Sequence, residues 1–177
     1  MAAKPGIFVI TGAPCAGKTT VIDELSKKGY NTIEEPSRKL LKRFPELRAA
    51  SASKTDVKRL QMMILNLMLE AEQNFIGNEP VFLDGGIPSC IAFFKIRSIS
   101  PPRRFVEACK NTKYSKVFML ERLPFYETDA LRQQTMKESE KIQNLLYKAY
   151  SGFGYKPIMV PVLPPTERAK LIEKLCS

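Results

Sequence analysis

The residues with the most specific chemistry lie in one short segment near the amino end of the chain. The run Gly12-Ala13-Pro14-Cys15-Ala16-Gly17-Lys18-Thr19 matches the pattern G-x-x-x-x-G-K-[ST] at every fixed position. The two fixed glycines let successive backbone N–H groups converge on phosphate oxygens, and a helix that starts there adds its positive end. The pattern therefore predicts a loop that binds a nucleoside triphosphate, ATP or another NTP, through Gly12, Ala13, Pro14, Cys15, Ala16, Gly17, Lys18, Thr19 and Thr20.

A magnesium ion is expected beside this loop. Lys18 would contact the β- and γ-phosphates, and the Thr19 hydroxyl would coordinate Mg²⁺. Asp84 ends a short apolar run, where a second oxygen ligand for the ion would lie. The alternative for Asp84 is a turn or helix-capping aspartate before Gly85. We interpret Thr19 and Asp84 as the metal ligands.

Two adjacent glutamates, Glu34 and Glu35, close the second apolar run. A carboxylate at this place can accept a proton from a hydroxyl group as it attacks the γ-phosphate. Side chains alternate along a strand, so only one of the two should face the site. We predict that Glu35, next to Pro36, is this base; the alternative is a solvated acid at the start of a helix.

Phosphoryl transfer also needs positive charge over the migrating group. The polar segment 121–141 carries several basic residues and lies in the right chain order for a lid. Arg132 is the first candidate for this charge and Arg122 the second, and for each the alternative is an ordinary exposed arginine. The run from Pro101 to Arg104 predicts a turn with a solvated basic pair.

The elements that would position these residues alternate in type. Apolar β-rich runs predict strands at 6–11, 30–33, 80–84, 116–121 and 157–160, and helical patterns predict helices at 17–27, from 35 onward, and at 55–76, 139–150 and 165–175. This alternation predicts an α/β protein whose parallel sheet is covered by helices on both faces. Ligands of such sheets bind at the carboxyl ends of the strands. Thr11, Glu35, Asp84 and Glu121 all fall at such ends.

Length and composition suit one nucleotide-binding domain over residues 1–177, with 44% apolar and 26% charged residues. No apolar run is long enough to span a bilayer and the start has no signal-peptide pattern, so we expect a cytoplasmic protein. The four cysteines show no C-x-x-C spacing and histidine is absent, which favours buried thiols over a zinc site. Met62, Met63 and Met68 are expected in the core.

The net charge of +10 favours an acidic partner, and a phosphate-rich small molecule accounts for it. Nucleic acid is a weaker candidate, because the basic residues are scattered and tryptophan is absent. The sequence does not indicate an oligomeric state.

Several segments together resemble the small AAA-type P-loop ATPase/kinase family that includes the ribosylnicotinamide kinase domain of the bacterial NAD regulator. The matching segments are 8–20, 33–38, 82–88, 123–129 together with Arg132, and 154–168. The resemblance implies a three-layer P-loop NTPase fold with strand order 2-3-1-4-5 and a helical lid. The pair Glu35-Pro36 is also similar to the Glu-Pro of deoxynucleoside kinases, in which the glutamate is the base. Both groups usually have an arginine where this chain has Gly85, so Arg38 or a lid residue such as Arg122 would replace it as a substrate ligand.

Three functions remain open from these observations. The first is an ATP- and Mg²⁺-dependent kinase that phosphorylates a small nucleoside-like or related hydroxyl compound. The second is a regulatory NTP-binding protein with slow hydrolysis and no small acceptor, which the missing arginine at Gly85 would fit. The third, suggested by charge alone, is a kinase or binder of nucleic-acid ends. Specificity for guanine is not supported, because no N-K-x-D sequence occurs.

Overall fold

The computed structural model describes residues 5–48, 53–75, 79–123 and 136–177. Its centre is a parallel sheet of five strands in the order β2-β3-β1-β4-β5, which is the predicted order. The strands are β1 Gly6–Thr11, β2 Asn31–Ile33, β3 Pro80–Asp84, β4 Lys116–Leu120 and β5 Ile158–Val160. Each lies within one residue of its predicted bounds. The strand β1 is central, and its Ile10 is paired with both Asp84 of β3 and Phe118 of β4.

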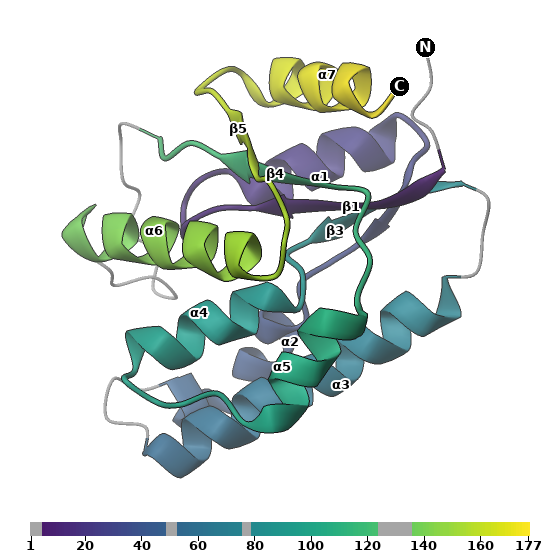
Figure 1. Cartoon of the computed structure of the whole chain (residues 1–177). Helices are drawn as coiled ribbons and strands as arrows, with labels where there is room; N and C mark the ends of the chain where they lie inside the picture. Colours follow the sequence, from purple (N-terminus) through teal and green to yellow (C-terminus); the bar gives the residue numbers. More distant parts are fainter. Residues whose placement is uncertain (1–4, 49–52, 76–78, 124–135) are drawn as a thin grey trace.

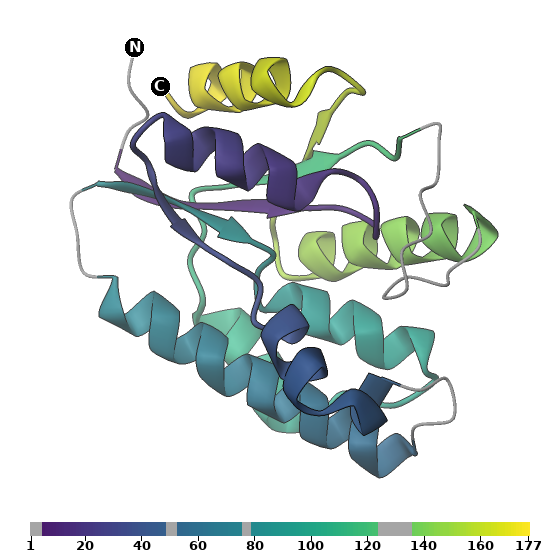
Figure 2. The same ribbon diagram turned by 180° about the vertical axis from the view of Figure 1, so that it is seen from behind.

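Helices cover both faces of the sheet, as predicted, and form a three-layer structure (Figure 1). The helices are α1 Lys18–Lys27, α2 Ser37–Arg43, α3 Lys54–Asn74, α4 Pro88–Ile96, α5 Arg103–Asn111, α6 Met136–Gly152 and α7 Pro165–Cys176, with a 3₁₀ turn at Pro45–Arg48. The pair α1 and α7 packs on one face, whereas α3, α4, α5 and α6 lie on the other; α2 packs beside α3 (Figure 2).

The alternation of side chains along the strands divides the core into two parts. On β1, Phe8 and Ile10 face α1 and α7, whereas Val9 faces the layer of α3 to α6. Both faces are therefore buried, which explains why the central strands have continuous apolar runs rather than alternating patterns. All the strands run in one direction, so their carboxyl ends, where the candidate site residues lie, meet at one edge of the sheet.

The predicted turn at Pro101–Arg104 is wrong in part. Pro102 directly precedes α5, and Arg103 and Arg104 form the first turn of that helix. Both arginines remain exposed, as expected, and Arg103 pairs with Glu107 one turn later at 2.6 Å. The helix α4 was not predicted either, because its residues are apolar on most of its circumference and carry no helical periodicity.

The start of α3 and the surroundings of the cysteines complete the description of the fold. Ser53 accepts a hydrogen bond from the Asp56 amide at 3.1 Å while Asp56 accepts one from the Ser53 amide, so α3 begins with a capping box. Among the described cysteines no disulfide forms; Cys90, Cys109 and Cys176 are buried and Cys15 is half-buried. No helix in the described ranges is both long and apolar enough to cross a bilayer.

Candidate functional site

The predicted phosphate loop connects β1 to α1 at the carboxyl edge of the sheet. Gly12 has a φ of 147° and Gly17 a φ of 85°, which side-chain-bearing residues rarely adopt. Cys15 also has a positive φ, 62°, so the loop bends where a ligand would approach. The helix α1 begins directly after Gly17 and has no acidic residue in its first turn. Its amino end is thus open to an anion.

Lys18 lies over the loop. Its ammonium group donates to the carbonyl oxygens of Gly12 at 3.0 Å and Ala13 at 3.2 Å. These neutral partners are weaker acceptors for an ammonium group than a phosphate would be. The side chain is therefore placed to transfer its hydrogen bonds to a bound triphosphate.

Gln143 of α6 fixes the start of the loop from outside. Its Oε1 accepts a hydrogen bond from the Ala13 amide at 2.6 Å, and its Nε2 donates to the Leu120 carbonyl at 3.0 Å. One amide side chain therefore joins the phosphate loop to the end of β4. Gln143 was not identified from the sequence, because a single glutamine in a polar helix carries no recognisable signal.

Arg168 of α7 fixes the end of the loop. It is only 1% exposed, and its guanidinium donates to three carbonyl groups: Ala16 at 2.6 Å, Pro161 at 2.9 Å and Glu121 at 3.2 Å. A planar group with several fixed donors suits such a role better than a lysine would. Arg168 lies at the end of the segment 154–168, which contributes to the family resemblance, and its contact with the loop was not predicted.

Thr19 and Asp84 come together as expected for ligands of one ion. Thr19 Oγ1 donates to Asp84 Oδ2 at 3.0 Å, and Asp84 is only 5% exposed. Its Oδ1 atom is buried and has no hydrogen-bond partner among the described residues. A buried carboxylate oxygen without a partner is costly, and a hydroxyl beside a carboxylate suits Mg²⁺. The described residues contain no cluster of three acidic, cysteine or histidine side chains, so phosphate oxygens would have to complete the coordination.

The structure separates the two adjacent glutamates. Glu34 is exposed and pairs with Lys39 at 3.1 Å, whereas Glu35 lines the same cavity as Lys18. Burial raises the pKa of Glu35, and the nearby Asp84 adds to the increase. Lys18, a hydrogen bond from Ser37, and Arg38 act in the opposite direction. Glu35, rather than Glu34, is thus a carboxylate in a desolvated site.

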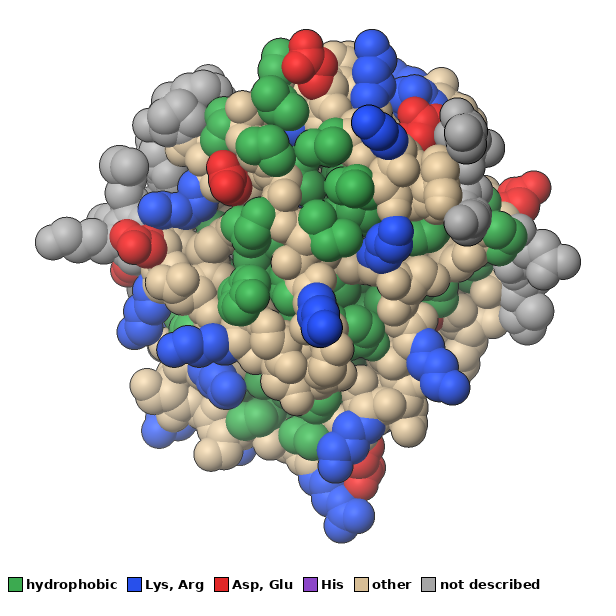
Figure 3. Space-filling view, turned by 45° about the horizontal axis from the view of Figure 1, so that its top comes forward, with side chains coloured by type: hydrophobic (Ala, Val, Ile, Leu, Met, Phe, Trp, Pro, Cys, Tyr) green, Lys and Arg blue, Asp and Glu red, His purple; other side chains and the backbone are tan. Residues whose placement is uncertain are grey.

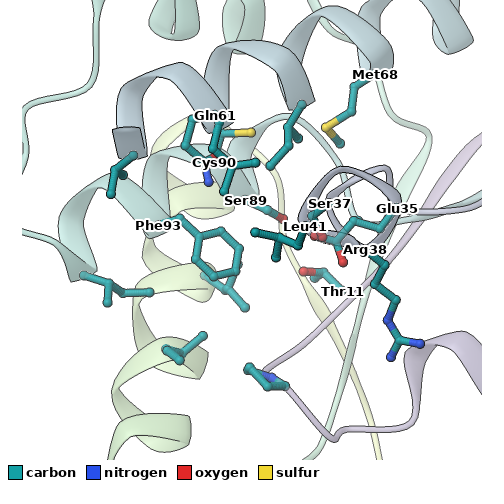
Figure 4. A pocket seen from close by; sticks show the side chains of 18 of the residues that line it. Thr11, Glu35, Ser37, Arg38, Leu41, Gln61, Met68, Ser89, Cys90 and Phe93 are labelled. Atoms are coloured by element: carbon teal, nitrogen blue, oxygen red, sulfur yellow. The ribbon is translucent and has the colours of Figure 1, made fainter. Parts of the chain in front are cut away.

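A cavity of about 310 Å³ extends from the phosphate loop between α2, α3, α4 and α6. Its polar end contains Thr11, Glu35, Ser37 and Arg38, and Phe93 and Gln61 lie at the other end (Figure 4). The walls between are mostly aliphatic, and they include Met68, which therefore contributes to the cavity as well as to the core. The Oε1 atom of Gln61 is buried and has no hydrogen-bond partner among the described residues. Gln61 was not identified from the sequence.

The predicted arginines differ in their placement. Arg38 lines the cavity beside Glu35. Arg122 follows β4, where a terminal nitrogen lies 3.8 Å from Glu140, and does not line the cavity. Arg132 and the middle of the predicted lid, residues 124–135, lie outside the described residues. Gly85 has a φ of 86°, and an arginine would be strained in this conformation. The local backbone therefore favours glycine over arginine at this position.

Basic side chains are dispersed over the face shown in Figure 3 and form no continuous stripe there. This distribution gives no support on that face for a nucleic-acid groove, which needs clustered positive charge. The carboxyl edge of the sheet therefore holds the most specific chemistry among the described residues.

Comparison with known proteins agrees with this geometry. Residues 7–168 match the AAA domain family. The chain belongs to this family. No curated protein sequence matches the chain.

Solved structures with the same fold include three examples at low sequence identity. The deoxyadenosine kinase from M. mycoides with bound dATP has a TM-score of 0.70 and 16% identity, over 97% of this chain and 100% of that one. The thymidylate kinase from Candida albicans has a TM-score of 0.65 and 14% identity, over 99% and 92%. The NadR protein in complex with NR has a TM-score of 0.76 and 14% identity, over 97% of this AAA domain chain and 52% of NadR. The present chain thus spans about half of NadR. At these identities the similarity establishes the P-loop kinase fold.

Replacement of Lys18 tests the phosphate loop. Because its ammonium donates to two loop carbonyls and is not part of the core, Lys18→Ala should leave the unfolding temperature without ligand nearly unchanged and remove most of the stabilisation by ATP·Mg²⁺. Thermal unfolding with and without ATP·Mg²⁺ measures both. Lys27→Ala, at an exposed position in the last turn of α1, is the matched control. Equal stabilisation of the Lys18 variant and the parent would contradict the assignment.

Proposed function

We propose that this AAA domain protein is an ATP- and Mg²⁺-dependent kinase that transfers the γ-phosphate to a hydroxyl group of a small nucleoside-like compound. The observation that carries this proposal is one cavity with Lys18 and Glu35 at its polar end and an apolar extension beyond them. A hydrolase needs space only for water, whereas this cavity can hold a small organic acceptor. The common fold with deoxyadenosine and thymidylate kinases supports the same reaction class.

The roles of the residues follow from their positions. The phosphate loop and Lys18 would bind the triphosphate, and Thr19 with Asp84 would hold Mg²⁺, which neutralises charge on the phosphates. Glu35 would accept the proton of the acceptor hydroxyl while the hydroxyl oxygen bonds to the γ-phosphorus. The bond from that phosphorus to the β–γ bridging oxygen then breaks, and ADP leaves. Arg38, also in the cavity, would supply positive charge near the acceptor. Arg132 remains a candidate for the charge over the migrating phosphoryl group.

The end of the cavity that contains Phe93 and Gln61 is suited to an acceptor with a ring as its main body. Its walls are aliphatic, with Phe93 on one side, so a flat apolar body would be well packed there. Gln61 Oε1 would then accept a hydrogen bond from an N–H group on the edge of the ring. A nucleobase or a similar heterocycle has both features.

A screen of acceptors tests the proposal. ADP release from ATP·Mg²⁺ should rise well above the rate with water alone in the presence of at least one member of a panel of nucleosides, nucleotides and nicotinamide riboside. A coupled ADP assay measures the rate for each compound. Tight binding of one nucleotide with slow hydrolysis and no active acceptor would contradict the kinase and favour a regulatory NTP-binding protein, which the glycine at position 85 would also fit.

Glu35→Gln tests the base. The variant should keep ATP binding and lose about 10²- to 10⁴-fold in kcat, because the amide cannot accept the proton. For the parent, kcat/KM should fall toward acid pH with a midpoint above the ordinary glutamate pKa of 4.5, since burial raises the pKa of Glu35 and only the ionised form is active. Glu34→Gln, one residue away and exposed, is the control and should keep both kcat and the pH profile. Retained turnover in Glu35→Gln would exclude this role.

Gln61→Leu tests recognition of the acceptor. Loss of one hydrogen bond of about 1.4 kcal/mol should raise the KM of the acceptor about tenfold and leave the KM of ATP unchanged. Steady-state kinetics with each substrate varied in turn measures the two constants. Gln73→Leu, at an exposed position on the same helix, should change neither. A Gln61 variant with parental KM values would show that the amide does not contact the acceptor.

A further inference from the structure

The turn after Asp84 is held by two tyrosine hydroxyl groups from distant parts of the chain. The Gly86 amide donates to Tyr150 Oη at 2.9 Å, and the next amide, Ile87, donates to Tyr114 Oη at 2.9 Å. Tyr150 lies near the end of α6, and Tyr114 lies in the loop before β4. Consecutive backbone groups are therefore fixed by two independent elements.

The local sequence is adapted to this arrangement. Gly85 has a φ of 86° and donates its amide to Ile10 of β1 at 2.9 Å, so the chain turns sharply as soon as β3 ends. A Cβ atom at Gly86 would lie 2.9 Å from the ring of Tyr114, which leaves no space for a side chain. The two glycines thus allow the turn and the close approach of the ring that holds it.

Tyr150 connects the turn with the cavity. It is fully buried, and its hydroxyl lies 2.9 Å from Ser89 Oγ, with the Thr11 side chain as a further hydrogen-bond partner. Ser89 and Thr11 both line the cavity. One hydroxyl group therefore contacts the end of β1, the turn after β3 and the first turn of α4.

Tyr114 is oriented by an acid. Its hydroxyl donates to Glu72 Oε1 of α3 at 2.8 Å. Because an ionised carboxylate only accepts hydrogen bonds, the tyrosine proton points to Glu72 and its lone pairs remain for the Ile87 amide. Burial raises the pKa of Glu72 to about 7, so this arrangement is best populated above neutral pH.

We propose that Tyr150 and Tyr114 are positioning residues for the metal. By fixing the turn, they set Asp84 so that its Oδ2 meets Thr19 while its buried Oδ1 stays open to a divalent cation. They would act as the outer partners of metal ligands do, through the backbone rather than through the carboxylate itself. The inference rests on the Mg²⁺·ATP site of the proposed function, but not on the identity of the acceptor.

The test compares stabilisation by ATP with and without metal. At pH 8 and a fixed high ATP concentration, Mg²⁺ is titrated and the unfolding temperature is recorded for the parent, Tyr150→Phe and Tyr114→Phe. Each variant should need on the order of tenfold more Mg²⁺ for half of the extra stabilisation, with the shift caused by ATP in EDTA unchanged. Tyr147→Phe, at an exposed position on α6, should behave like the parent.

Each result decides a different point. A parental Mg²⁺ midpoint in the folded variants, or an equal loss of the metal-free and metal-dependent shifts, would overturn the inference, because a merely structural role affects both alike. If Tyr150→Phe shows no cooperative unfolding, the Mg²⁺ midpoint of Tyr114→Phe tests the inference instead, because Tyr114 binds the neighbouring Ile87 amide. Absence of any Mg²⁺ effect in the parent would contradict the proposed metal site as well. Failure of every acceptor in the kinase screen would leave this measurement valid.

Discussion

A phosphate-binding loop must keep its backbone N–H groups available for the ligand, and the rest of the site depends on how this constraint is met. Such a loop cannot be stabilised by the hydrogen bonds of a helix or a sheet, so its shape must be fixed from outside. Gln143 occupies one amide, that of Ala13 at the start of the loop, and Arg168 holds the loop near its end through the Ala16 carbonyl, which leaves the Ala16 amide untouched by this contact. Both side chains also bind the segment at the end of β4, through Leu120 and Glu121. The loop and this strand end are thereby held as one unit.

Asp84, the acid that faces the loop, is likewise fixed by contacts from outside the loop. Asp84 lies at the end of a central strand, where its backbone is fixed by the sheet on one side and by the Gly85 turn on the other. Thr19 occupies one carboxylate oxygen, and the other is buried with no hydrogen-bond partner in the part of the chain that the structure describes. A cation bound at this carboxylate oxygen would satisfy its buried polarity. The desolvation that raises the pKa of Glu35 comes from the same closed geometry.

Sequence patterns predicted the sheet because its causes are local. Buried strands appear as apolar runs, Ser53 and Asp56 define the start of α3, and the phosphate loop has fixed residue types at fixed spacing. The choice of Glu35 over Glu34 as the residue that faces the cavity followed from alternation and from the resemblance to deoxynucleoside kinases. Their positions agree with that choice.

The parts that were not predicted depend on contacts between residues far apart in the chain. Ala13 and Gln143 are 130 positions apart, and Ala16 and Arg168 are 152 apart. Nothing in the local sequence around a glutamine or an arginine indicates such a partner. The helix α4 was missed for the opposite reason: burial on nearly all sides removes the periodicity that would mark it. Gln61 was not identified because its place in the cavity depends on α4, and in the sequence it is one polar residue of a long helix.

The geometry of the turn explains why glycine, rather than arginine, stands at position 85. The families that the sequence resembles usually have an arginine at this place, and its absence suggested that Arg38 or a lid residue replaces it as a substrate ligand. Here the backbone has a positive φ, and the next residue packs against Tyr114 without space for a Cβ atom. The turn is thus organised around small residues and tyrosine hydroxyl groups, while Arg38 of α2 lines the cavity. Under the proposed function, Arg38 would supply positive charge near the acceptor, and Tyr150 and Tyr114 would fix the position of Asp84. The absence of the arginine is therefore compatible with phosphoryl transfer and is not by itself an argument for a regulatory protein.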